Sequence, residues 1–71
     1  MEHIIVKIIG EEEERVPVLV NNEENGFTNE VIQLEEGYVE LSVKIPGAET
    51  IEIELIDTTA EEPMEVFINV V

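Results

Sequence analysis

Cysteine and tryptophan are absent from this 71-residue sequence, and the aromatic residues are only two Phe and one Tyr. Without Cys the chain can form neither a disulfide framework nor a cysteine-based zinc site. A single His argues against a catalytic zinc site of the usual kind. We therefore expect no metal and no cofactor.

The sequence also lacks an apolar run of the roughly 20 residues that a membrane-spanning helix needs. Glu2 and His3 precede a short apolar run that Lys7 interrupts. A signal peptide has a basic start and an unbroken apolar core instead. We therefore expect a cytoplasmic protein that makes no contact with a membrane.

Basic residues are scarce. The chain has 3 Lys plus Arg against 18 Asp plus Glu, which gives a formal net charge of -15. A charge of this size disfavours anionic partners such as nucleic acid and acidic membrane surfaces, and it favours basic proteins and cations. The composition therefore predicts a basic protein partner and no direct binding of nucleic acid.

Hydrophobic residues make up 44% of the chain and are rich in Ile and Val. These β-branched side chains fit a pleated sheet better than a helix. A chain of this length is close to the lower limit at which a hydrophobic core alone stabilises a domain. We expect one domain, residues 1–71, built from β-strands.

Two segments near the start of the chain show the alternation of β-strands. They cover residues 4–9 and 16–20, and Gly10 with a run of glutamates separates them. Residues 4–20 are therefore predicted to form a β-hairpin. Because Pro17 has no N–H to donate, its strand is predicted to lie at a sheet edge or to contain a bulge.

Residues 38–45 show the clearest alternation, with apolar side chains on one face and polar ones on the other. Residues 50–56 repeat this pattern, which predicts an antiparallel hairpin with an acidic outer face. Short strands are predicted at residues 31–34 and 64–71. Residues 21–29, rich in Asn, Glu and Gly, are predicted to be a loop. Together these segments predict a small antiparallel β-sandwich of about six or seven strands.

A recognisable order of short motifs occupies the middle of the chain. A strand at residues 18–20 leads into a polar turn with Gly26 and Thr28. A short strand then ends at Leu34 and is followed by a turn at Gly37, where a positive φ is expected because two strands reverse there.

This run, within residues 18–66, resembles the "G-x-T-P, strand, L-x-x-G, strand" pattern of the PEGA domain, a small β-sandwich module of bacterial and archaeal proteins. Asn29 stands where that family commonly has Pro. The resemblance implies a non-catalytic module that serves as an accessory or interaction domain, often in envelope-associated proteins.

Asn21–Gly26 carries oxygen-bearing side chains at alternate positions before a Gly, as in the first half of an EF-hand calcium loop. The twelfth position, which would be a bidentate Glu, is Ile32 here, and the β pattern leaves no room for flanking helices. We prefer an ordinary loop. A calcium-dependent adhesive or structural domain is a third interpretation of the chain.

A hydrolytic triad would need His3 close to a nucleophile such as Ser42 or Thr28. No nucleophile motif surrounds either hydroxyl, and Ser42 lies in a regular strand rather than on a strained turn. We therefore predict that the protein is not an enzyme.

Acidic side chains supply the candidate partner surface. Like charges on adjacent strands cost free energy. An acidic sheet face therefore indicates a compensating role, which is either contact with a basic partner or protection against edge-to-edge association. The acidic turn after Gly10 is predicted to be a solvated tip or a contact with basic peptides. The candidates are Glu40, Glu52 and Glu54 on the hairpin and Glu11, Glu12, Glu13 and Glu14 in the turn.

The sequence therefore predicts a non-enzymatic binding or structural module whose acidic surface contacts a basic protein. The alternative is an acidic inhibitor, or nucleic-acid mimic, that occupies the nucleic-acid site of another protein. The net charge equals that of about 25 Å of duplex axis. A mimic would gather this charge on one face, whereas the glutamates here are spread over nearly every turn and strand.

Overall fold

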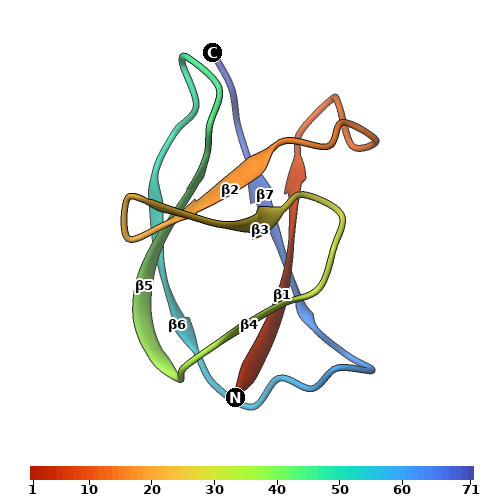
Figure 1. Ribbon diagram of the computed structural model, residues 1–71, viewed down its shortest axis with the longest axis vertical. Helices are drawn as coiled ribbons and strands as arrows, with labels where there is room; N and C mark the ends of the chain where they lie inside the picture. The colour runs from red at the N-terminus through yellow and green to blue at the C-terminus, as the bar shows by residue number, and fades with distance from the viewer.

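The structure is a computed structural model that describes residues 1–71, and it contains seven β-strands and no helix (Figure 1). The predicted all-β class is confirmed. No segment forms a helix capable of crossing a lipid bilayer. In chain order the strands are β1 (Glu2–Ile8), β2 (Pro17–Val20), β3 (Glu23–Phe27), β4 (Ile32–Leu34), β5 (Gly37–Val43), β6 (Ile51–Leu55) and β7 (Met64–Ile68).

The strands form two sheets. The three-stranded sheet has the order β4-β1-β7, and the four-stranded sheet has the order β3-β2-β5-β6. Every pair is antiparallel except β1 and β7, which run parallel with Ile4 opposite Met64 and Ile8 opposite Ile68. The predicted antiparallel arrangement is therefore wrong for this pair.

Both sheets contribute to one hydrophobic core of 13 buried residues. Ile4, Val6 and Ile8 of β1 share a face, as their alternation predicts, and they are at most 1% exposed. Leu41 of β5 and Leu55 of β6 are fully buried on the other sheet. We call the face of each sheet that carries these side chains its inner face, and the opposite one its outer face.

The predicted hairpin of residues 4–20 is wrong, because β1 and β2 lie in different sheets. Both sides of β1 are occupied, one by β4 and the other by β7. Residues 9–16 thus carry the chain from one sheet to the other. The alternation indicates the inner face of each strand correctly, but the same pattern suits a strand in either sheet.

Pro17 opens β2, which lies between β3 and β5 and is not an edge strand. The register with β3 shifts between Pro17 and Leu19, so the missing N–H falls at an irregular point of the ladder. The Pro17 carbonyl still accepts a hydrogen bond from Lys44 N at 3.0 Å. Of the two predicted situations for this proline, the bulge is confirmed and the edge is wrong.

Residues 21–29, predicted to be a loop, contain β3. Asn21 and Asn22 join β2 to β3 in a two-residue turn, and both have positive φ, 50° and 69°, as a type I′ turn requires. Four of the five β3 residues are exposed, so the strand has no apolar alternation. The Asn-Asn pair is the sequence signal for this hairpin.

The predicted hairpin of residues 38–45 and 50–56 is confirmed, because β5 and β6 pair antiparallel. The predicted strands at residues 31–34 and 64–71 are confirmed as β4 and a somewhat shorter β7. Gly37, at the reversal between β4 and β5, has a φ of 124°, which favours glycine as expected.

Candidate functional site

Three glutamates gather on the outer face of β5 and β6. Glu40 lies directly opposite Glu52, and Glu54 lies opposite Tyr38. All three glutamates are exposed. Like charges directly opposite each other destabilise a sheet by up to about 1 kcal/mol. We call these three residues the β5–β6 acidic face.

The negative charge of the β5–β6 acidic face is not compensated within the chain. Each of the three basic residues forms its ion pair with a different glutamate elsewhere. The pairs are Lys7 Nζ with Glu65 Oε2 at 2.9 Å, Arg15 Nε with Glu30 Oε2 at 2.7 Å, and Lys44 Nζ with Glu24 Oε2 at 2.5 Å.

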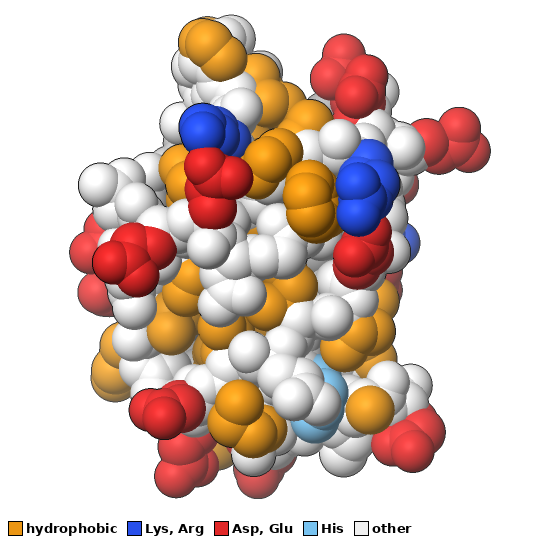
Figure 2. Space-filling view, viewed as in Figure 1, with side chains coloured by type: hydrophobic (Ala, Val, Ile, Leu, Met, Phe, Trp, Pro, Cys, Tyr) orange, Lys and Arg blue, Asp and Glu red, His pale blue; other side chains and the backbone are white.

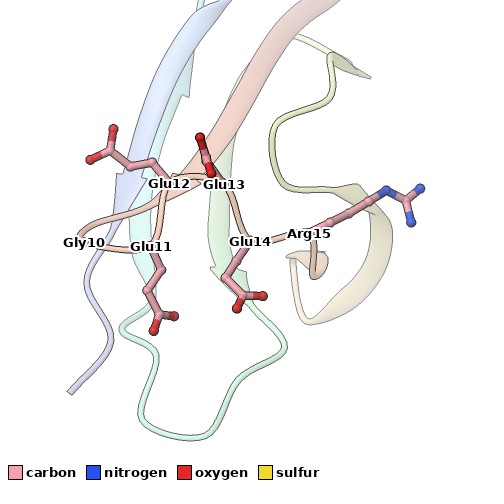
Figure 3. A pocket seen from close by; sticks show the side chains of 6 residues that line it. All are labelled: Gly10, Glu11, Glu12, Glu13, Glu14 and Arg15. Atoms are coloured by element: carbon pink, nitrogen blue, oxygen red, sulfur yellow. The ribbon is translucent and has the colours of Figure 1, made fainter.

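The other predicted contact residues, Glu11–Glu14, lie in the connection between β1 and β2. They line an open hollow of about 580 Å³ that has no hydrophobic side chain in its wall. Figure 3 shows Glu12 and Glu13 pointing to one side of the connection and Glu11 and Glu14 to the other. The four carboxylates therefore do not converge on one ligand.

The two predicted sets form two separate surfaces. In Figure 1, β5 and β6 lie on the left of the molecule and the connection between β1 and β2 lies at the upper right. The face seen in Figure 2 carries acidic side chains around its outline and beside the Lys and Arg side chains, rather than in one patch. The structure brings together Glu40, Glu52 and Glu54 but does not add Glu11–Glu14 to them.

A second hollow, of about 310 Å³, borders the β5–β6 acidic face. Glu40 and Ser42 of β5 and Leu19 of β2 line it. Ser42, predicted on the solvent side of its strand, is only 8% exposed, and its hydroxyl donates to the Glu49 carbonyl at 2.8 Å. The connection between β5 and β6 folds over this part of the sheet, a path that strand alternation does not indicate.

Glu2, at the start of β1, is tied to the connection between β6 and β7. Its Oε1 accepts hydrogen bonds from the backbone N and the hydroxyl of Thr58, both at 2.8 Å. The Thr58 hydroxyl accepts a further bond from His3 N at 2.6 Å. The bonds from the backbone and the hydroxyl of Thr58 favour the charged carboxylate and hold the pKa of Glu2 below its ordinary value.

Thr28 and Asn29 fix the connection between β3 and β4. The buried Thr28 hydroxyl donates to the Glu14 carbonyl at 2.5 Å and accepts from Val16 N at 3.0 Å. Asn29 Nδ2 donates to the same carbonyl at 3.0 Å, and Asn29 N donates to the Val6 carbonyl at 2.9 Å. The φ of Asn29 is 63°, which proline cannot adopt. The position at which the PEGA family commonly has Pro is thus built differently here.

The residues considered for a triad are not brought together. His3 lies on the outer face of β1, with its Nε2 3.4 Å from Nε2 of Gln33. The hydroxyls of Ser42 and Thr28 hydrogen-bond to backbone carbonyls in other parts of the chain. These three side chains form no nucleophile–base pair.

The segment Asn21–Gly26 forms a turn and most of a strand rather than a cation-binding loop. Asn21 is bound to β5, since its Oδ1 accepts from Glu40 N at 3.0 Å and its own N donates to the Glu40 carbonyl at 2.8 Å. No cluster of three or more His or acidic side chains is placed to hold a metal ion. The likeness to an EF-hand half-loop has no counterpart in the structure.

We found no match to this chain among protein-family models, curated proteins or solved structures. The relation to the PEGA domain therefore stays a prediction from the motifs themselves. What the protein binds has to be inferred from its own geometry and charge.

Proposed function

We propose that this protein is a non-enzymatic binding module that contacts a basic protein through the β5–β6 acidic face. The pair of Glu40 and Glu52 supports this most directly, because two like charges lie opposite each other with no basic side chain of the chain paired to them. A cationic group placed between the two carboxylates relieves their repulsion.

We also propose that the two sheets pack as a β-sandwich. Two sheets that share one core support a β-sandwich. The motif order within residues 18–66 supports a PEGA-like module with an accessory or interaction role. The cytoplasmic location stays a prediction.

Capture of a partner at low salt tests the function. The bait variant Glu40→Gln, Glu52→Gln, Glu54→Gln removes the charge of the β5–β6 acidic face. The control variant Glu11→Gln, Glu12→Gln, Glu13→Gln removes the same amount of charge from the separate turn. The proposal expects a basic protein that is captured by the parent and the control, lost with the first variant, and released as the salt concentration rises. Equal capture by both variants would refute it.

A nucleic-acid mimic is the alternative function. The longest extent of the molecule, 30 Å, is comparable to the roughly 25 Å of duplex axis that carries an equal charge. The separation of the β5–β6 acidic face from Glu11–Glu14 favours a partner-selective surface over a mimic, which would gather its charge on one face. A mimic would displace DNA or RNA from the captured partner, so a failure to compete excludes this alternative.

A further inference from the structure

β6 is an edge strand with one free side. It is the last strand of the four-stranded sheet and pairs only with β5. No hydrogen bond outside that ladder involves the backbone of Ile51–Leu55. The N–H and C=O groups on the other side of β6 are therefore available to a further strand.

The core is incompletely covered next to this free edge. Ile51 and Ile53 belong to the inner face of β6 but are only partly buried, whereas Leu55 in the same strand is inaccessible. Met64 at the start of β7 is also partly buried. β7 is itself the edge of the other sheet, and no ladder joins it to β6. We call the unjoined edges of β6 and β7, with the partly buried Ile51, Ile53 and Met64, the seam.

The seam is held in place at both ends. Residues 56–63 join the end of β6 to the start of β7 near the N terminus (Figure 1). At the other end Ala48 bridges to Val70, and Glu49 N donates to the Asn69 carbonyl at 2.9 Å. The chain segments at the two ends of the seam are therefore joined, at one end by residues 56–63 and at the other by these backbone bonds.

The negative charge beside the seam determines which kind of strand can pair favourably with β6. Glu52 and Glu54 stand on the outer face of β6 without a basic partner in the chain. A second copy would place β6 against β6 and bring like charges together, which is unfavourable. An occupant with Lys or Arg at alternate positions places opposite charges there instead.

We propose that β6 binds an extended segment of a basic protein by strand addition. The segment is about five residues long, to match β6, and alternates Lys or Arg with β-branched residues. Its basic side chains lie beside Glu52 and Glu54, and its apolar side chains cover Ile51 and Ile53. This inference rests on the proposed function and specifies how the basic partner is held.

A short peptide of alternating lysine and valine tests the mode of binding, with alternating lysine and glycine as a peptide of equal charge. We expect the lysine–valine peptide to bind at low salt and to slow hydrogen exchange of the outward amides of Ile51–Leu55 by about tenfold or more, since they gain hydrogen-bond partners. The lysine–glycine peptide should bind at least about tenfold more weakly, because it cannot cover the seam.

Charge reversal supplies the matched variants. Glu52→Lys with Glu54→Lys should weaken binding about tenfold or more, whereas Glu12→Lys with Glu13→Lys should change it less than about threefold. Absence of peptide binding, or binding that leaves the β6 amides unprotected, overturns strand addition. If protection is absent but the first variant alone loses binding, the proposed function stands without strand addition. If no basic partner or peptide distinguishes the two variants, both proposals fail.

Discussion

Asn29 occupies a backbone conformation, φ of 63°, that Asn and Gly adopt far more readily than other residues and that proline cannot adopt. Its N–H donates to the Val6 carbonyl, which joins the connection between β3 and β4 to β1. We expect Asn29→Pro to lower the free energy of unfolding by about 2–4 kcal/mol, from backbone strain and the lost bond. Urea unfolding followed by far-UV circular dichroism measures the change.

Asn29→Gly is the control for that substitution. Glycine tolerates the positive φ and keeps the N–H, so only the Nδ2 bond to the Glu14 carbonyl is lost. Its cost should be about 1 kcal/mol or less. An Asn29→Pro variant as stable as Asn29→Gly would show that this position does not hold the left-handed conformation.

Glu2 links stability to pH through its bonds with Thr58. The folded state lowers the pKa of Glu2, so this carboxylate contributes stability above its unfolded pKa, about 4.3, and that contribution is lost as the pH falls through the folded value. We expect Glu2→Gln to unfold at lower urea concentration than the parent at pH 7. The difference should shrink as the pH falls through the folded pKa of Glu2, because the protonated side chain is neutral like Gln.

The control for this pH dependence is Glu12→Gln, in the turn between β1 and β2. It removes the same charge without removing a hydrogen bond to Thr58. A Glu2→Gln variant whose urea midpoint follows that of Glu12→Gln at every pH would mean that the bonds to Thr58 contribute no stability.

Strand elements differ in how clearly the sequence indicates them. The alternation in residues 38–45 and 50–56 predicts β5, β6 and their pairing correctly, because these two strands, which follow each other in the chain, are also neighbours in one sheet. The same alternation in residues 4–20 leads to a wrong hairpin, because it specifies a buried face and not a neighbour. β3 could not be recognised by alternation at all, since its exposed residues are held by the ladder with β2.

The candidate site likewise has one part that the local sequence pattern predicts and another that it does not. The exposed positions of Glu40, Glu52 and Glu54 could be predicted from the period of two in their strands. The free edge of β6 and the partly covered Ile51 and Ile53 could not, because they depend on which strands end each sheet. Strand order is decided by pairings between distant segments, which a local pattern does not contain.

At the scale of elements, the opposition of Glu40 and Glu52 predicts a stabilising charge reversal. Glu52→Lys replaces repulsion by attraction across the ladder and should raise the free energy of unfolding by about 0.5–1 kcal/mol. Glu12→Lys, which changes the net charge equally, should raise it less. In a Glu40→Gln background the same Glu52→Lys substitution should raise the free energy of unfolding much less than it does in the parent, and an equal gain in both backgrounds would argue against a pairwise origin.

For the whole molecule, mutual repulsion is the main consequence of a net charge of -15 on an accessible surface of 4530 Å². No two charges lie much further apart than the longest extent, 30 Å, and the screening length falls from roughly 20 Å to 4 Å between 0.02 and 0.5 M salt. We expect Tm to rise over this range by several degrees, about 4–8 °C for each kcal/mol of relieved repulsion.

The three ion pairs, which are at least partly exposed, act in the opposite direction, because salt weakens them. Most acidic side chains have no such pair, so repulsion should dominate. A variant with Glu11→Gln, Glu12→Gln, Glu13→Gln and Glu14→Gln should show a smaller rise in Tm with salt than the parent. A Tm that is flat or falls with salt in the parent would contradict this expectation.

The parallel ladder between β1 and β7 sets the order in which the chain can fold. Ile4 lies opposite Met64, so all the strands from β2 to β6 precede, in the chain, the one that gives the central strand of the smaller sheet its second neighbour. Contacts between such distant segments carry a large loop-closure cost and place proteins of this kind among slow folders, in the range of about milliseconds to seconds. During synthesis, β1 therefore cannot complete its sheet until β7 has left the ribosome.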